Sequence, residues 1–385
     1  MAQPATQAPP QDFLLSELPA NEQAFIAKVR SFAEDYVLPN TRAWESARAF
    51  PNDIWTTVGK MGLLGLAVPK NLGGLGYSVA AYCWAIKEIA RADPALAMNL
   101  AAANALSVGH LVHFASKEQQ AKYLQGAMEG TIRLSWSLTE PNAGSDARMV
   151  QSKAAPIEER PGFFHLNGEK MFITNGGTSD LTIVFAQFPE GQVTAFLMET
   201  DQPGFQPKRR IDTVGVCASN TLQYEMHDAV AWHTPCSFAD CVWMLQRGRL
   251  GIAGMAVGIA EKAMELTVEY SKQRMQFNRR LADMQSVQNM IADSLTEIEA
   301  SWLLTLNGSK KLETGVDCAR ESSMAKLFAS ETANRATDHA IQIHGGRGMT
   351  PDYLVEKLWR DAKLTEIGEG ASEIQRLVIS KLALK

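Results

Sequence analysis

The segment of this 385-residue chain that most needs a chemical explanation is IGEGASEIQRL, residues 367–377. A single carboxylate, Glu369, stands between Gly368 and Gly370, and a run with helical spacing follows it. Glycine beside a lone acid is poor material for a hydrophobic core, but it lets a backbone approach a ligand closely. Glu369 is therefore either a residue of a surface turn or an acid that acts on a bound ligand.

A second polar stretch is SWSLTEPNAGSD, residues 135–146. Its hydroxyl and glycine residues, among them Thr139, Gly144 and Ser145, can present hydroxyls and backbone N–H groups to a phosphate, a carbonyl or a heterocycle. A well-capped connection between two elements is an equally good interpretation.

In a third stretch, KMFITNGG at 170–177, an aromatic residue and a hydroxyl residue alternate along an expected strand. Phe172 and Thr174 could cover a flat ring and bond its edge. They could equally be one core residue and one edge residue.

Two further stretches carry cations or glycines near expected helix ends. SKQRMQF at 271–277 contains Arg274, whose alternative role is to complement the negative end of a helix. QIHGGRG at 342–348 contains Gly345 and Gly346, which permit close backbone approach or simply cap a helix.

Composition narrows the class of protein. The chain is 46% hydrophobic and 21% charged, its formal net charge is −5, and its five cysteines form no CxxC pair. We expect a soluble, cytoplasmic globular protein with reduced thiols, no metal site, and no broad basic face for nucleic acid or anionic membrane. Residues 1–19 are expected to be a flexible lead-in. The apolar stretch 95–114 favours a buried helix over a membrane span, because polar residues interrupt it.

The hydrophobic period changes twice along the chain. It is helical over 20–130, changes to short β-forming runs between Gly, Pro and Asn turns over 131–237, and is helical again over 238–385. These patterns predict an N-terminal α-helical domain, a compact middle antiparallel β-domain and a C-terminal helical bundle. A Rossmann domain is disfavoured because strands and helices do not alternate and no GxGxxG follows a strand.

Taken in order, the motifs LTEPNAGSD, KMFITNGG, RMQF, QIHGGRG and GEGASEIQRL resemble those of the acyl-CoA dehydrogenase family. The resemblance runs from about residue 20 to the end and includes the three-region layout, for which it implies a middle antiparallel β-barrel-like domain and a C-terminal four-helix bundle. The sequence looks like a short-chain or branched-chain member. The resemblance implies FAD bound between the β-domain and the C-terminal bundle, and a homo-oligomer, usually a tetramer built as a dimer of dimers.

The same resemblance assigns roles to particular residues. The FAD-binding set that it implies is Trp136, Leu138, Thr139, Gly144, Ser145, Phe172, Thr174, Arg274, Phe277, Gln285, Gln342, Gly345, Gly346 and Glu373. The first seven would meet the flavin ring or a phosphate. Arg274, Phe277 and Gln285 would hold the adenosine-diphosphate half, which Gln342 and the two glycines would reach from a neighbouring subunit.

The reaction implied is α,β-dehydrogenation of an acyl-CoA thioester, with Glu369 as the base that removes the α-proton and flavin N5 as the hydride acceptor. The implied substrate-binding set is Ser145, Gln246, Arg249, Gly368 and Gly370. An electron-transfer flavoprotein is the implied electron acceptor.

Three departures from the family pattern refine this expectation. Some relatives carry the base on the first helix of the C-terminal region, where this chain has Gln246 and Gly248, so Glu369 is favoured. Gly368 replaces the usual tyrosine and Ala371 the usual threonine, which predicts room for a branched, cyclic or bulky acyl group. Alternatives on the same fold are an acyl-carrier-protein dehydrogenase, a CoA-ester desulfinase or an oxidase. A non-catalytic DNA-binding flavoprotein is disfavoured by the acidic charge.

Overall fold

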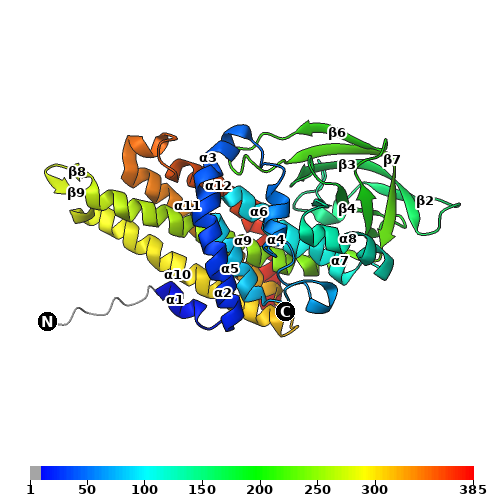
Figure 1. Ribbon diagram of the computed structural model, residues 1–385, viewed down its shortest axis with the longest axis horizontal. Helices are drawn as coiled ribbons and strands as arrows, with labels where there is room; N and C mark the ends of the chain where they lie inside the picture. Colours follow the sequence, from blue (N-terminus) through cyan, green and yellow to red (C-terminus); the bar gives the residue numbers. More distant parts are fainter. Residues whose placement is uncertain (1–9) are drawn as a thin grey trace.

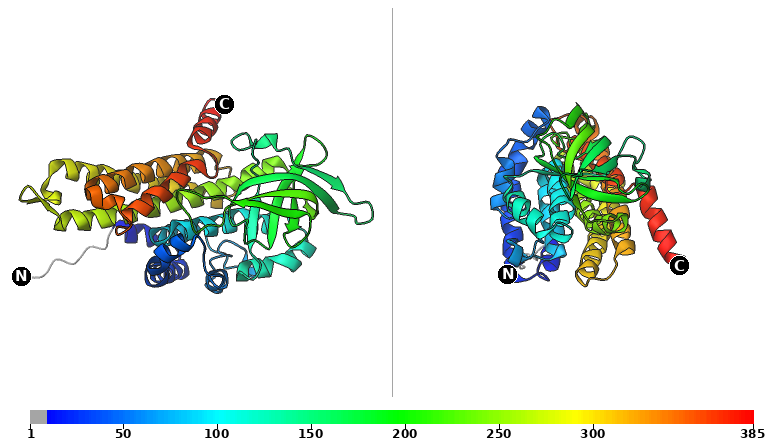
Figure 2. Two further views of the ribbon diagram at one scale, coloured as in Figure 1. Left: turned by 90° about the horizontal axis from the view of Figure 1, so that it is seen from above. Right: turned by 90° about the vertical axis from the view of Figure 1, so that its right-hand side faces the viewer.

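The computed structural model describes residues 10–385 and contains three regions (Figure 1). Helices form the N-terminal and C-terminal regions, and a β-sheet region lies at one end of the molecule. The long helices of the C-terminal region extend away from the sheet toward the opposite end, which is also seen from above in Figure 2. The predicted fold class, an N-terminal helical domain, a middle β-domain and a C-terminal helical bundle in chain order, is confirmed.

Residues 10–129 of the N-terminal region form eight helices and three short irregular helical turns. They are α1 (Pro10–Leu15), α2 (Ala20–Phe32), η1 (Ala33–Val37), α3 (Leu38–Ala47), α4 (Ile54–Lys60), η2 (Lys70–Leu72), α5 (Val79–Ala92), α6 (Pro94–Ala102), η3 (Ala103–Ser107), α7 (Val108–His113) and α8 (Lys117–Glu129). Ser78 and Asp93 accept hydrogen bonds from the first turns of α5 and α6, so each helix begins at a side-chain cap.

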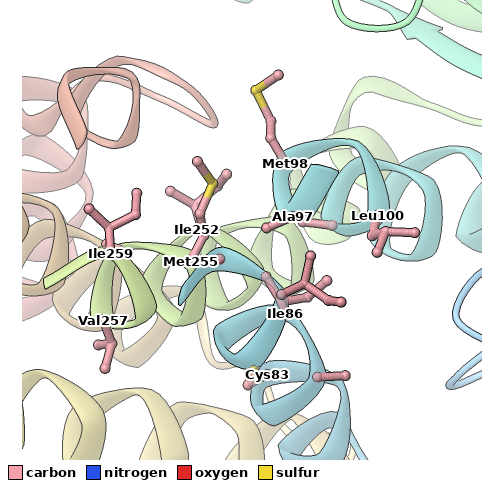
Figure 3. Packing of buried hydrophobic residues seen from close by; sticks show 14 of the residues in the cluster. Cys83, Ile86, Ala97, Met98, Leu100, Ile252, Met255, Val257 and Ile259 are labelled. Carbon is pink, nitrogen blue, oxygen red and sulfur yellow. The ribbon is translucent and has the colours of Figure 1, made fainter. Parts of the chain in front are cut away.

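The most apolar helix of the described residues is Pro94–His113, which is long and apolar enough to cross a membrane, with a mean hydropathy of 1.4. In this structure 83% of its most apolar window is buried inside the protein. Figure 3 shows Ala97, Met98 and Leu100 beside residues of α5 and α9 (Phe238–Gln273). Its apolar residues therefore pack in the core, as the sequence favoured.

The expected flexible lead-in is only partly open to comparison, because residues 1–9 lie outside the described residues. Residues 10–15 form α1, and Leu14, Leu15 and Leu18 pack against the main hydrophobic core. Three leucines within five positions bury enough apolar surface to order a short helix.

The β-region contains seven strands: β1 (Leu134–Ser137), β2 (Lys153–Pro156), β3 (Phe163–Ile173), β4 (Leu181–Gln187), β5 (Val193–Glu199), β6 (Phe205–Arg210) and β7 (Leu222–Thr234). The pairings β4–β2–β3–β7–β5 return to β4 and so close a ring, which fits the barrel-like prediction. The ring is not wholly antiparallel, since β1 runs parallel to β4, and β2 meets β4 in parallel at one residue pair.

The C-terminal region contains four long helices and a final one. They are α9, α10 (Gln285–Glu313), α11 (Ala319–His344), α12 (Val355–Ile367) and α13 (Ser372–Ala383), with a small hairpin, β8 (Met275–Gln276) and β9 (Arg279–Arg280), the turn η5 (Leu281–Asp283) after it, and the turn η6 (Gly345–Met349). Helix α9 starts next to the sheet at a capping box made by Ser237 and Asp240. Its 36 residues span about 54 Å, so one end lies next to the sheet and the other end lies toward the opposite end of the molecule.

Close packing of α9 on α5 depends on glycine. A Cβ added at Gly251 would lie 2.0 Å from the Tyr82 hydroxyl oxygen, and one at Gly258 would lie 2.3 Å from the Lys87 carbonyl oxygen. This contact brings the N-terminal region against the part of α9 that carries the next residues of interest.

Candidate active site

Glu369 lies in the tight turn between α12 and α13 and has a left-handed backbone, with φ of 57°. Gly370 follows with φ of 95°, so two consecutive residues are left-handed. A non-glycine residue rarely adopts this conformation without support. The support comes from two side chains: Gln375 Nε2 donates to the carbonyls of Glu369 (3.1 Å) and Gly370 (2.8 Å), and Lys326 Nζ donates to the Gly370 carbonyl (2.8 Å).

The carboxylate of Glu369 rests directly on Gly248 of α9. A Cβ added at Gly248 would lie 2.5 Å from Glu369 Oε2 and 2.7 Å from Oε1, which is closer than real Cβ contacts come. The Glu369 carboxylate therefore fills the space that a side chain at position 248 would take. Gly248 is required by the close approach, since any side chain would displace the acid.

The electrostatic surroundings of Glu369 favour a base that works near neutral pH. Its Oε2 atom is buried and accepts no hydrogen bond in the described residues. Burial raises the pKa of Glu369 to about 7, although the nearby cations Arg249 and Lys326 act to lower it. Arg249 is itself buried and donates to Ser323 Oγ at 3.3 Å.

A second group of predicted residues meets on the face of the β-region. The Met171 N–H donates to the Thr139 carbonyl at 3.0 Å, which places Thr139 beside Phe172. The turn is anchored from below, because buried Lys170 donates to the Leu138 carbonyl (3.1 Å) and to Glu140 (2.8 Å).

This face has the features of a site for a flat ring. Phe172 has φ of 57° and is 56% exposed, so a large aromatic ring is held out of the core. Trp136 Nε1 is buried without a hydrogen-bond partner in residues 10–385. An exposed aromatic, a nearby hydroxyl and an orphaned donor fit the edge and face of a flavin. Thr174 follows on the same segment and is half-buried, while Gly144 and Ser145 lie exposed in the loop after β1.

The remaining predicted FAD residues lie at the far end of the bundle (Figure 1). Arg274 and Phe277 belong to the hairpin region between α9 and α10, and Gln285 begins α10. Gln342, Gly345 and Gly346 lie at the end of α11, where Tyr270 of α9 stacks on His344 with ring centroids 4.2 Å apart. The structure thus puts both groups at one end of the chain, and their contribution from a neighbouring subunit stays a prediction.

Comparisons with known proteins decide the family. The descriptions "Acyl-CoA dehydrogenase, N-terminal domain", "middle domain" and "C-terminal domain" match residues 19–131, 135–229 and 238–384. The chain belongs to the acyl-CoA dehydrogenase family.

Individual relatives of this family match along nearly the whole chain. An acyl-CoA dehydrogenase of Bacillus subtilis (strain 168) is 38% identical, covering 94% of this chain and 98% of the relative. The short-chain specific acyl-CoA dehydrogenase of Megasphaera elsdenii is 33% identical, covering 97% and 100%. The solved butyryl-CoA dehydrogenase of Megasphaera elsdenii superposes with a TM-score of 0.92 at 33% identity, covering 96% and 99%. The solved glutaryl-CoA dehydrogenase of Mycobacterium smegmatis in complex with FADH2 gives a TM-score of 0.91 at 26% identity, covering 97% and 96%.

Against this acyl-CoA dehydrogenase background, three predicted residues have definite places. Gln246 is buried and fastens the start of α11, since its Nε2 donates to Asp317 (2.7 Å) and its Oε1 accepts from the Cys318 N–H (3.0 Å). Gly368 is half-buried beside the base, and Glu373 is exposed in the first turn of α13. Substrate contacts of Gln246, Arg249, Gly368 and Gly370 stay predictions.

Sequence reasoning missed Lys326 and Tyr82, which both lie near Glu369. The charge of Glu369 raises the pKa of the fully buried Tyr82, after burial as the main cause. A signal for Lys326 exists in the sequence: it stands at helical spacing among the small residues Ser322, Ser323 and Ser330, and such a row marks a buried face.

Proposed function

We propose that this chain is an FAD-dependent dehydrogenase of acyl-CoA thioesters in which Glu369 removes the proton α to the carbonyl. The observation that carries the proposal is the buried Glu369 carboxylate on Gly248, with an unpartnered Oε2 atom and a pKa raised to about 7. A general base is most effective when its pKa is near the working pH.

The backbone of the turn supplies the complementary acid function. The Glu369 N–H donates no hydrogen bond within residues 10–385. A free N–H next to the base can bond the thioester oxygen as enolate character develops on it, which makes the α-proton more acidic. Arg249 and Lys326 offset the negative charge that gathers at the same place.

Trp136, Thr139, Phe172 and Thr174 would hold the flavin ring of FAD, the cofactor with which relatives have been solved. FAD, when bound, supplies N5 as the acceptor of the hydride that leaves the β-carbon. The left-handed Glu369 turn and the β-region face would fix the α- and β-carbons between base and ring.

We propose a branched, cyclic or otherwise bulky acyl group as the substrate class, based on Gly368. Its φ of −64° is open to any residue, and a Cβ there would make only ordinary contacts, 3.6 Å or more, with Leu364. The backbone therefore does not require glycine, and the missing side chain leaves space beside the base. Steady-state rates with branched and straight thioesters test this, and a preference for butyryl-CoA or octanoyl-CoA would contradict it. Gly368→Tyr should shift selectivity toward straight chains.

We further propose that FAD is shared between copies of the chain. The ring-binding face lies at one end of the molecule, and half-buried Arg274 and exposed Phe277 and Gln285 lie at the other, so the adenosine-diphosphate half would be held by another copy. Sedimentation of the yellow protein tests this, and a monomer with full FAD content would contradict it. An electron-transfer flavoprotein remains our proposed acceptor, to be tested as oxidant of the reduced protein.

The decisive experiment replaces the base. Glu369→Gln should keep FAD and the fold but slow flavin reduction by acyl-CoA about 10³-fold, since a general base contributes roughly 10²–10⁴. Reduction is followed by anaerobic bleaching of the flavin in a single turnover. Retained turnover in Glu369→Gln would show that another residue is the base. The same assay with an acyl-carrier-protein thioester in place of acyl-CoA separates the two carriers.

A further inference from the structure

Lys326 differs from the other fully buried lysines of the described chain. Four lysines are among its largest fully buried side chains: Lys87, Lys170, Lys326 and Lys357. The first contacts Glu261 (3.0 Å), the second Glu140 (2.8 Å) and the last Asp361 (2.6 Å). Burying an ammonium is costly unless a carboxylate pairs with it. In residues 10–385 only Lys326 lacks such a contact among the four, and its hydrogen bond goes to the Gly370 carbonyl instead.

That carbonyl belongs to the turn that carries the proposed base. Lys326 projects from α11, one helical turn after Ser323, which accepts a hydrogen bond from Arg249. One side of α11 thus carries both Lys326 and, one turn earlier, the hydroxyl that binds Arg249. Lys326 and Arg249 are the two cations that act on Glu369. A lysine whose role was only to stabilise the bundle would gain more from a carboxylate than from a carbonyl.

We propose that Lys326 is a positioning residue for Glu369: its hydrogen bond to Gly370 holds the left-handed turn, and its charge keeps the Glu369 carboxylate ionised beside the substrate. The inference rests on the proposed function, in which Glu369 is the base. Lys326 itself takes no proton from the substrate.

The charged groups around Glu369 and Lys326 are few. Besides Lys326 itself on α11, they lie on α9, α12 and α13. Arg249 on α9 faces both Glu369 and Lys326, while Glu366 on α12 and Glu373 on α13 act on Lys326. Burial lowers the pKa of Lys326 to about 8, and the charge of Glu369 acts against this. Tyr82 and Cys241, which also lie near Glu369, are buried with raised pKa values and stay neutral at working pH. Lys326 and Arg249 are thus the cations that act on the base.

Gln375 provides a neutral comparison at the same turn. Its side chain donates to the carbonyls of both Glu369 and Gly370, as Lys326 does to the second, but it carries no charge. Gln375→Met removes mechanical support alone, Lys326→Met removes support and charge, and Lys326→Arg keeps the charge.

The experiment measures the pH dependence of single-turnover flavin reduction in the FAD-loaded protein. The unaltered protein should lose activity as pH falls through about 7. In Lys326→Met the midpoint should rise by roughly one unit, since a nearby opposite charge lowers a carboxyl pKa by about 1–3 units. A one-unit rise leaves about fivefold less ionised base at pH 7. Gln375→Met should slow the reaction at every pH without moving the midpoint, and Lys326→Arg should restore the midpoint.

An unchanged midpoint in Lys326→Met, or equal shifts in Lys326→Met and Gln375→Met, would overturn the proposal. If Lys326→Met does not fold, Lys326→Gln keeps a donor without the charge and is held to the same midpoint criterion. Failure of the proposed function is separate: it would show as retained turnover in Glu369→Gln. If Glu369→Gln is inactive and the midpoint of the pH profile is unchanged in Lys326→Met, the proposed function stands and only the positioning role of Lys326 is refuted.

Discussion

The turn at Glu369 and the hairpin between β8 and β9 use the same uncommon backbone conformation in opposite surroundings. Glu369 has φ of 57°, and the two central hairpin residues, Phe277 and Asn278, have φ of 51° and 57°. The Glu369 turn is held by side chains of α11 and α13 and rests on α9. Phe277 is 90% exposed, and its ring is in none of the aromatic contacts of residues 10–385.

This difference indicates which part of the site one chain completes by itself. A strained residue persists where its surroundings over-determine it, and Lys326, Gln375 and Gly248 do this for Glu369. A left-handed aromatic residue in a two-residue hairpin turn costs about 1–2 kcal/mol and gains nothing from exposure to water. The hairpin therefore has the character of a surface that is covered in the assembled protein, in agreement with the proposed sharing of FAD.

The largest effect is expected from a substitution at the closest contact of the Glu369 turn, which is the contact with Gly248. Gly248→Ala places a Cβ 2.5 Å from Glu369 Oε2, so the carboxylate must move. We expect flavin reduction to slow about 10²-fold, since a displacement of about 1 Å has an effect of that size. Gly368→Ala is the matched control for folding, because its Cβ makes ordinary contacts and its melting temperature should equal that of the parent. Full activity in Gly248→Ala would contradict the place assigned to the carboxylate.

The exposed hairpin should respond in the opposite way. Phe277→Ala should leave the free energy of unfolding of the FAD-free chain within about 0.5 kcal/mol of the parent, because the ring contacts little. It should weaken FAD binding about tenfold or more, as loss of a buried aromatic anchor does. Titration calorimetry with FAD measures this. Phe13→Ala, another exposed aromatic (70%), is the control and should change neither quantity. A Phe277→Ala variant that is less stable than the parent but binds FAD with unchanged affinity would contradict the proposal.

The sequence predicted the Glu369 turn but not what holds it. Motif order located the acid, and the helical period located α9 and α11, because both signals are local. The contact of Gly248 with Glu369 joins residues 121 positions apart, and no local pattern encodes it. Lys326 could have been suspected from the small residues around it, but its burial depends on how α12 and α13 pack against α11.

In the β-region the sequence predicted short β-forming runs over 131–237, and this part of the chain does form strands. The strand β6, FQPKRR, is not a β-forming run, because it is rich in charge and contains proline. β6 pairs with β7 alone and is mostly exposed, so it is an edge strand, where proline and charge are tolerated.

The smallest expected effect is that of the buried Glu369 carboxylate on the free energy of unfolding of the chain. The pKa of Glu369 is raised from 4.5 to about 7 in the folded chain, so the folded state holds this proton more tightly than the unfolded state. The contribution of Glu369 to stability is therefore fully present below pH 4.5 and is lost as pH rises through 7. The shift corresponds to at most about 3 kcal/mol.

Glu369→Gln should accordingly unfold at a higher temperature than the parent at pH 8, with the difference closing toward pH 5. Thermal unfolding of the FAD-free proteins at several pH values measures it, and the same comparison for exposed Glu373→Gln should show no such trend. A stabilised but inactive variant would mean that the turn keeps an acid in an unfavourable place because the reaction needs it there. A variant less stable than the parent at pH 8 would instead mean that Arg249 and Lys326 depend on the charge of Glu369 to be buried.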